Sequence, residues 1–284
     1  MIQFPGTNST TGAGFSVSVE DLGMSASNNA SVSAIVNEFS QEQSYVRHVN
    51  FVNFTQPVLV IGQSPGDAGA QNSGPYENLY FRSVADGCVK LYSNGTRGIH
   101  HMTCNGNSTP PPVGVWLDGA NNMIEDAHFE GFTDGILIGS QAQASGSVIS
   151  AVNGNSNDIN GNMGNVVHIS NLNATGDLTL TGIRANAAHS DNTAPNSIKD
   201  DVTTTTLSDA TVGIYALGEA AASGVGGPAG YSRLTTSPHV PNWGVGSKTP
   251  TLTCETGSLF SNVLGTSGGH DTLYVCEGGG WVGK

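Results

Sequence analysis

The sequence has little charge, and most of that charge is acidic. Only 11% of its 284 residues are charged, with nine Lys and Arg against 22 Asp and Glu, and the formal net charge is −13. No stretch concentrates Lys or Arg, so the chain lacks a surface that could follow nucleic-acid phosphates, and nucleic acid is not an expected partner. No apolar run reaches the roughly 18 to 20 residues that cross a bilayer, so no membrane span is expected.

Helix surfaces rich in Ala, Leu, Glu, Lys and Arg are also missing, which excludes a helical bundle. Short runs of Val, Ile, Leu and Phe recur along the whole length, which excludes intrinsic disorder. Gly occurs 39 times, and Asn, Ser and Thr fill much of what remains. The chain therefore consists mainly of short apolar segments separated by turn residues.

The chain has only four cysteines, Cys88, Cys104, Cys254 and Cys276. None lies in a CxxC pair or near a histidine at metal-ligand spacing, so a zinc site is weakly supported. We expect two local disulfides instead, Cys88 with Cys104 and Cys254 with Cys276. Disulfides indicate an oxidising compartment, so the expected location is extracellular or at a surface, either secreted or on a virion. Because no export signal is visible at the N-terminus, we expect a longer precursor or another export route.

One motif recurs along the first part of the chain. An aromatic or apolar residue is followed three positions later by a second one, then by a turn and a short strand of apolar residues. The pairs are Phe51/Phe54, Phe81/Val84, Phe129/Phe132 and the weaker Ile169/Leu172. In the same order, the strands that follow these pairs contain Val58 and Val60, then Cys88 and Leu91, then Ile136 and Ile138, and finally Leu178 and Leu180. Units of roughly 20 to 30 residues with short strands predict a parallel β-solenoid, in which each coil packs on its neighbours.

The same region resembles the right-handed parallel β-helix family of pectate lyases, polygalacturonases and phage tailspikes. The resemblance lies in VEDLGMSAS (19–27), YVRHVNFVNF (45–54) and MIEDAHFEGFTDGILIG (123–139). It implies an all-β, right-handed parallel β-helix that is directed at carbohydrate. The matching residues are core and turn positions, so they indicate the fold more strongly than the activity.

Three regions are expected along the chain. Residues 1–220 carry the solenoid pattern, and residues 221–250 form a Gly- and Pro-rich linker. Residues 251–284 resemble the small cysteine-flanked C-terminal β-module of secreted bacterial and phage β-helix proteins. We expect strands at 258–261 and 272–276 in a small β-hairpin module, clamped by Cys254 and Cys276 because so small a core is marginal by itself.

Asp86 and Asp134 are candidate catalytic carboxylates. Each lies just before a glycine at what the repeat indicates is the same position, two coils apart. Adjacent coils are about 4.8 Å apart, so the carboxylates would be roughly 9.6 Å apart, near the upper end of the range used by inverting glycosidases. An Asp-Gly pair is also a common way to begin a turn, and that structural interpretation stays open.

Arg97 and His100 are the candidate base and general acid/base, in the segment TRGIHHMTCNG (96–106). The resemblance implies the role of Arg97, since pectate lyases use Arg or Lys to remove the proton next to the uronate carboxyl. The Gly-His-Gly and Arg-Ile-Lys motifs of polygalacturonases are absent, and the nearest string to the second is GIRA (182–185). Strand alternation would place His100 and His101 on opposite faces, one of them in the core or a turn.

Asp126 and Glu130 are the candidate metal ligands, within the densest acidic cluster of the chain. Oxygen-rich clusters bind calcium, and calcium would let an acidic protein hold an anionic sugar. Solvated acidic residues at a turn and strand need no ligand, so this alternative also stays open.

Exposed aromatic rings could bind sugars by stacking. Tyr80, Tyr92 and Trp116 are the candidate substrate-binding residues. Alternation places Tyr80 on the outer face, opposite the inward Leu79 and Phe81. Core packing is the alternative for Trp116, because apolar residues flank it.

Two functional hypotheses follow from these observations. The first is an extracellular β-helix protein that binds or cleaves polysaccharide; as an enzyme it would be a polysaccharide lyase or a glycoside hydrolase. The second is a non-catalytic structural or adhesive solenoid, such as a filament or tail-fibre subunit. Because no helix is expected over the first coil, Ile2 and Phe4 are predicted to lie in a self-association contact. The alternative is that the helix-compatible segment within residues 25–43 folds back over that end.

Overall fold

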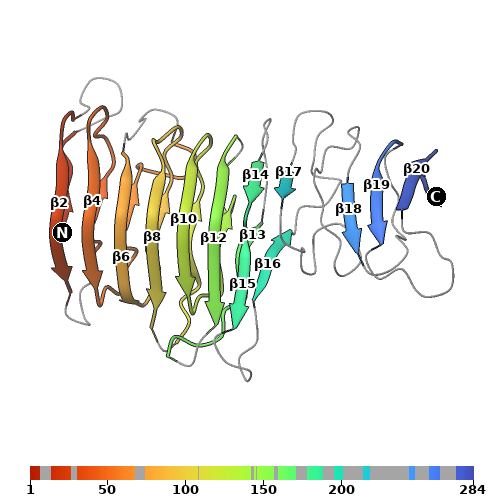
Figure 1. The fold of residues 1–284 in the computed structure, drawn as a ribbon. Coiled ribbons are helices and arrows are strands. Elements are labelled where there is room, and N and C mark those ends of the chain that lie inside the picture. The colour runs from red at the N-terminus through yellow and green to blue at the C-terminus, as the bar shows by residue number, and fades with distance from the viewer. Residues whose placement is uncertain are drawn as a thin grey trace.

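The computed structural model describes an all-β chain, with no helix in the residues that it covers. These residues are 1–6, 14–26, 31–67, 74–107, 109–141, 144, 146–156, 159–170, 178–187, 195–200, 214–217, 243–246, 256–262 and 273–284. The strands lie side by side in chain order, from β2 at one end of the molecule to β20 near the other (Figure 1). The predicted parallel β-solenoid is confirmed.

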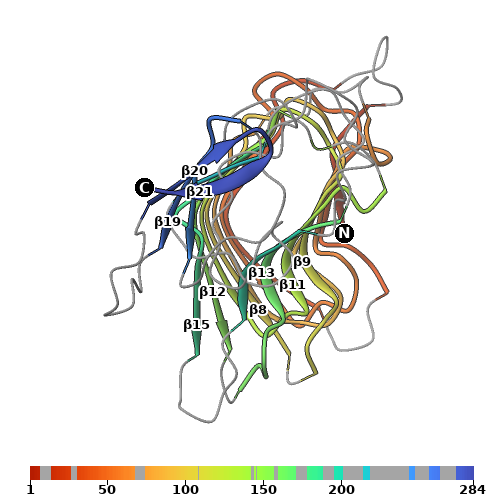
Figure 2. The same cartoon turned by 90° about the vertical axis from the view of Figure 1, so that its right-hand side faces the viewer.

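Most coils add one strand to each of two parallel sheets, which form different sides of the coil when the stack is viewed from its end (Figure 2). The short-strand sheet contains eight strands: β1 (Ile2–Gln3), β3 (Ile35–Asn37), β5 (Leu59–Ile61), β7 (Val89–Leu91), β9 (Val113–Leu117), β11 (Asp134–Ile138), β13 (Asn165–Ile169) and β16 (Asn196–Asp200). The long-strand sheet contains nine: β2 (Ser18–Ser25), β4 (Tyr45–Val52), β6 (Tyr76–Val84), β8 (Ile99–Gly106), β10 (Met123–Glu130), β12 (Val148–Ser156), β14 (Leu178–Thr181), β15 (Arg184–Ala187) and β17 (Ile214–Leu217).

Phenylalanines form a column along the axis of the solenoid, as predicted. Phe51 pairs in register with Phe81, and Cys104 separates Phe81 from Phe129 in the same column. All three rings are fully buried, and those of Phe51 and Phe81 are stacked with centroids 4.8 Å apart. The core therefore consists of equivalent positions in successive coils, which is the packing that a solenoid requires.

The apolar strand residues of the short-strand sheet also form columns. The inward residues of β5 are Leu59 and Ile61. The strand register, followed through β7 and β9, places them in the same columns as Ile136 and Ile138 of β11. Val60 lies between them, is partly exposed and aligns with Lys90 on the outer face. The repeat in the sequence predicts Val58 and Val60 at the positions of the two isoleucines, which is one residue out of register. The difference matters because a shift of one residue exchanges the two faces of a strand.

The long strands bend at one equivalent position in each coil. The residue there has φ of 52–54° from the first coil to the sixth: Asp21, His48, Asn78, His101, Asp126 and Ala151. Side chains that can bond to nearby backbone tolerate this left-handed conformation best, and five of the six residues are Asp, Asn or His. The bend interrupts strand alternation, so the residue at the bend and the residue before it both lie on the outer face.

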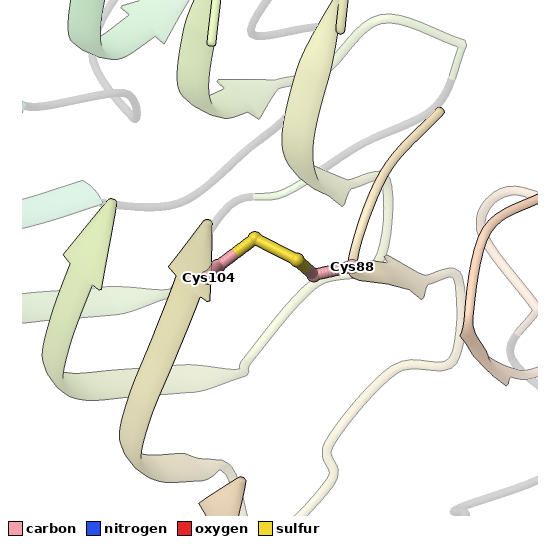
Figure 3. The surroundings of a disulfide bond; sticks show 2 residues. All are labelled: Cys88 and Cys104. Atoms are coloured by element: carbon pink, nitrogen blue, oxygen red, sulfur yellow. A yellow bond between two sulfur atoms is a disulfide. The ribbon is translucent and has the colours of Figure 1, made fainter. Parts of the chain in front are cut away.

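The predicted disulfide between Cys88 and Cys104 is confirmed, with their Cα atoms 6.2 Å apart. Figure 3 shows it joining β8, which holds Cys104, to Cys88 just before β7. Both residues are fully buried within the core cluster. The disulfide therefore links the two sheets across the interior of the solenoid.

The first coil is less well covered than those that follow it. Leu22 is 39% exposed, whereas Val49, the residue stacked on it in the next coil, is fully buried. Phe4 is only 2% exposed, so its own chain covers it, and Ile2 pairs with Ile35 of β3. The segment 25–43 contains strand β3 where a helix was one expectation. Self-association through this coil stays a prediction.

The C-terminal sheet has the strand order β18 (Trp243–Gly246), β19 (Leu259–Asn262), β20 (Leu273–Glu277) and β21 (Gly280–Gly283). The last three strands are antiparallel, while β18, which falls within the expected linker, pairs parallel with β19. Phe260 is fully buried against Tyr274 and Trp281. Cys276 is buried and disulfide-bonded, whereas Cys254 lies outside the described residues.

Candidate functional site

Two columns of charged and polar residues run along the outer face of the long-strand sheet. In the column just before the bend, acidic and basic residues alternate from coil to coil: Glu20, Arg47, Glu77, His100 and Glu125. At the bend itself the residues are Asp21, His48, Asn78, His101 and Asp126. We call these two columns the charge ladder.

The ladder is held together by contacts between adjacent coils. Arg47 lies 2.7 Å from Glu20 Oε2, and hydrogen bonds from Arg47 and then Tyr45 lower the pKa of Glu20. His48 Nδ1 lies 3.2 Å from Asp21 Oδ1, and the corresponding His101–Asp126 distance is 2.7 Å. These contacts join acidic residues of the ladder to an Arg or His of the adjacent coil.

His100 contacts an acceptor through each ring nitrogen. Its Nδ1 lies 3.2 Å from Glu125 Oε2, and its Nε2 lies 3.0 Å from the backbone carbonyl of Arg97. Only the doubly protonated ring can donate to both oxygens at once. His100 and His101 both lie on the outer face, contrary to strand alternation, because the left-handed backbone at His101 interrupts that alternation.

The predicted metal ligands Asp126 and Glu130 lie on one strand, and each has a protein partner. Asp126 contacts His101, while Glu130 contacts His128 Nε2 at 3.0 Å and accepts a hydrogen bond from Asn160 at 2.9 Å. Within the described residues, no three His, Cys, Asp or Glu side chains cluster as a metal site would require. Calcium binding stays a prediction.

A groove of about 550 Å³ begins where the ladder ends, along the bends of β10 and β12 and the connection between β14 and β15. Glu125 and Asp126 line one side, and Arg184 and Asn186 of β15 line the other. Asn153 of β12 lies between them and accepts a hydrogen bond from Asn186 at 3.2 Å. The groove thus combines two carboxylates, two amides and a guanidinium, which together can donate to and accept from a polyhydroxylated ligand.

Tyr80 lies on the same outer face of the long-strand sheet as this groove. Tyr80 is 38% exposed, whereas its neighbours Leu79 and Phe81 are buried, so its expected outward orientation agrees with the structure. The register places Tyr80, Thr103, His128, Asn153 and Arg184 in one column on successive coils. Four coil spacings separate Tyr80 from Arg184, which is about 19 Å. An extended polymer could contact both ends of this column.

The other two aromatic candidates lie on the short-strand sheet. Tyr92 is only 8% exposed, and Trp116 occupies an outward position between the fully buried Val115 and Leu117. Lys90 Nζ lies 5.1 Å from the centre of the Trp116 ring and 5.9 Å from that of Tyr92. The ammonium group of Lys90 therefore already makes cation–π contacts with both rings.

Asp86 lies beside the same lysine. Burial raises the pKa of Asp86, and Lys90 partly opposes that rise. Burial also raises the pKa of Tyr92, with smaller contributions from the charges of Asp118 and Asp86. Asp86, Lys90 and Tyr92 thus form a small, partly desolvated cluster away from the groove.

Asp134 begins β11 and has partners for both carboxylate oxygens. Asn165 donates to Oδ1 at 2.6 Å, and His168 Nδ1 lies 2.9 Å from Oδ2. Asp134 aligns with Val113, and the β7–β9 register then places Gly87, rather than Asp86, in that column. The two aspartates are two coils apart, as expected, but they are one residue out of register.

The four catalytic candidates belong to different sheets. Asp86 and Asp134 lie at or before strands of the short-strand sheet, whereas Arg97 and His100 lie at or before β8 of the long-strand sheet. Sequence reasoning missed Asn153 and Asn186, and it considered Arg184 only as part of an incomplete motif. The groove that brings these three residues together depends on coil lengths that no local pattern reveals.

Comparison with known proteins adds no relative: no family model, curated protein or solved structure matches the chain. Among the described residues, no helix has the length and apolar character needed to cross a membrane. The fold and the side-chain geometry therefore carry the functional argument.

Proposed function

We propose that this chain is an extracellular β-solenoid that binds polysaccharide along the outer face of its long-strand sheet. The observation that carries the proposal is the groove lined by Asn153, Arg184 and Asn186, together with the column of outward residues that runs in register from Arg184 to the exposed ring of Tyr80. Clustered amides, carboxylates and a guanidinium match the hydroxyl groups of a sugar, and an exposed tyrosine provides a flat face for stacking. The Cys88–Cys104 disulfide supports an oxidising location.

Binding is favoured over cleavage. Hydrolysis would need a pair of carboxylates, and the candidates are Asp86 and Asp134. The two carboxylate oxygens of Asp134 already contact Asn165 and His168. Arg97 and His100 lie on the other sheet. This separation supports a binding role in which the side chains hold a polymer without breaking it.

The test is a binding screen of neutral and uronate-containing polysaccharides, each with and without calcium, combined with an assay for released sugar ends. We expect binding without cleavage, weakened at least about tenfold by Arg184→Gln in the groove. Arg82→Gln is the matched control, because Arg82 is an exposed arginine on β6 outside the groove. Equal losses for both variants, or no binding of any polymer, would refute the proposal.

A structural or adhesive solenoid is the second candidate. The specific observation in its favour is the partly uncovered first coil, where Leu22 is 39% exposed at a position that is buried in later coils. Concentration-dependent assembly in the absence of polysaccharide binding would favour this function over the first.

A further inference from the structure

We infer that His128 is a positioning residue of the groove, and that it makes the groove selective for the configuration of the hydroxyl groups of an uncharged sugar polymer. The inference rests on the proposed function and adds the basis of its specificity. His128 lies on β10 outside the groove, and the register pairs it with Asn153, which lines the groove. The side chains of both residues belong to one chain of hydrogen bonds that ends in the groove.

The two neighbours of His128 fix the proton on its ring. Glu130 accepts a hydrogen bond from Asn160 through Oε2 at 2.9 Å, and its Oε1 lies 3.0 Å from Nε2 of His128. A carboxylate only accepts hydrogen bonds, so Nε2 is the donor in this contact. On the other side of the ring, the amide nitrogen of Asn153 lies 3.1 Å from Nδ1 and can only donate, so Nδ1 is the acceptor.

The chain of hydrogen bonds continues from Asn153 to Asn186. With Nδ2 turned to His128, Asn153 presents Oδ1 to the next coil, where Nδ2 of Asn186 donates to it at 3.2 Å. Turning the Asn153 amide over would exchange its oxygen and nitrogen, which would place two acceptors against each other at His128 and two donors at Asn186. Each of the two amides therefore has one preferred orientation, and His128 sets it from outside the groove.

This orientation decides which groups a ligand meets. An asparagine amide has two protons and two oxygen lone pairs. The amide of Asn153 uses one of each in this chain, so within the described part of the protein one proton and one lone pair remain for a ligand. Asn186 uses one proton, and its side chain is exposed beside that of Arg184. The groove thus presents donors and acceptors to a sugar in a fixed order.

Fixed donors and acceptors discriminate between sugars that differ only in configuration. A hydroxyl group that points at the matching amide atom forms a hydrogen bond, whereas the epimer directs that hydroxyl elsewhere and leaves the amide atom unpaired. One hydrogen bond of ordinary strength changes an affinity by about two- to tenfold. Amides that could turn over freely would lose this preference, because they could match either epimer.

Two substitutions of His128 separate its acceptor from its donor. The amide oxygen of asparagine is as many bonds from Cβ as Nδ1 of histidine, so His128→Asn retains an acceptor for Asn153. The amide nitrogen of glutamine corresponds in the same way to Nε2, so His128→Gln retains the donor to Glu130 but lacks the acceptor. His48→Gln is the matched control, because His48 is an outward histidine on β4, away from the groove.

The experiment measures the dissociation constants of hexasaccharides of glucose, mannose and galactose that share one type of linkage. The mannose and galactose polymers each differ from the glucose polymer in the configuration of a single carbon per ring. A chelator removes calcium, so the predicted metal ligands Asp126 and Glu130 do not contribute through a bound ion.

We expect the unmodified chain to prefer one of the three hexasaccharides at least about fivefold over another. His128→Gln should reduce that preference below about twofold, whereas His128→Asn and His48→Gln should retain it. A purely structural role for His128 would instead lower all three affinities in parallel, and that result would overturn the inference.

A double-variant cycle shows whether His128 acts through Asn153. Asn153→Asp replaces the amide nitrogen by oxygen, so it breaks the bond to Nδ1 from the other side. Because both changes break the same hydrogen bond, the double variant with His128→Gln should lose no more of the preference than Asn153→Asp alone. Additive losses would overturn the inference, since His128 would then act by another route.

Glu130→Gln keeps the test decisive if no variant of His128 folds. A glutamine amide can present either its oxygen or its nitrogen to Nε2, so the ring is no longer held with one arrangement of its proton, and the preference should fall. Equal affinities for the three hexasaccharides in the unmodified chain would overturn the inference, as would an unchanged preference in His128→Gln or Glu130→Gln. These results leave the proposed function standing. No binding of any of the three would also overturn the inference, while the wider polysaccharide screen decides the proposed function separately.

Discussion

The stack of Phe51 and Phe81 gives the sharpest test of how this solenoid is stabilised. Both rings are fully buried, and their centroids are 4.8 Å apart with the planes 15° from parallel. Phe81→Ala would remove a buried ring and leave a cavity between coils that the backbone ladders prevent from closing. Buried Phe→Ala substitutions cost about 3 to 5 kcal/mol, and the stacked pair contributes roughly 0.5 to 1.5 kcal/mol beyond the area that it buries.

The assay is denaturant unfolding followed by far-UV circular dichroism for Phe51→Ala, Phe81→Ala and the double variant. Because the two rings touch, the double variant should lose less than the sum of the single losses, by about the value of the stacked pair. Tyr80→Ala is the matched control, since Tyr80 is the outward neighbour of Phe81 on β6 and should cost less than about 1 kcal/mol.

The reasoning would be refuted if Phe81→Ala cost no more than Tyr80→Ala. It would also be refuted if the two single losses were strictly additive. The first result would mean that the column of rings does not stabilise the stack of coils, and the second that the two rings do not stabilise each other.

Four further predictions follow from the structure. Removing the Cys88–Cys104 disulfide, which closes a separation of 16 residues, should lower the unfolding free energy by roughly 3 kcal/mol. Denaturation of the Cys88→Ala/Cys104→Ala variant beside the unmodified chain, both without reductant, measures this loss. Burial raises the pKa of the Tyr76 hydroxyl, so as pH rises the unfolded chain loses the Tyr76 proton before the folded chain does. The free energy of unfolding should therefore fall as pH rises above about 10. Tyr76→Phe should make this fall shallower in thermal unfolding measured at alkaline pH. Gly114→Ala would place a Cβ atom 2.7 Å from Phe129 Cδ1 and should cost about 1 to 3 kcal/mol in the same unfolding assay; an unchanged midpoint would contradict this packing. Light scattering over a concentration series should show self-association through the first coil, and a strict monomer at high concentration would rule that out.

The local patterns of this sequence were sufficient to predict its core. The spacing of Phe51, Phe81 and Phe129 predicted an inward column, and the column forms because each coil must bury its apolar side on the coils next to it. The cysteine pair of the solenoid was predictable for a similar reason, since its two residues are close in sequence. Alternation along a single strand was likewise enough to place Tyr80 on the outer face.

The same patterns did not reveal the strand that runs through the expected linker or the last strand of the chain. Strand β18 contributes only four residues, including two glycines, and it gains its hydrogen bonds from β19, which lies well beyond it in the sequence. Strand β21 likewise follows a glycine pair, Gly278 and Gly279, both with positive φ. Pairing partners, rather than local composition, decide such strands.

The tertiary structure alone decided the candidate site. His100 meets Glu125, and Asn153 aligns with Arg184, only because each coil closes after a particular number of residues, and that number varies with the loops. The bend at His101 then turns two consecutive histidines toward the same face, against the alternation that the sequence predicted. Local patterns predicted the aromatic core, such as Phe51 and Phe129, because burial along a strand follows a short local period. The neighbours of an outward side chain lie one coil away in the sequence, so the number of residues in each complete coil determines which residues they are.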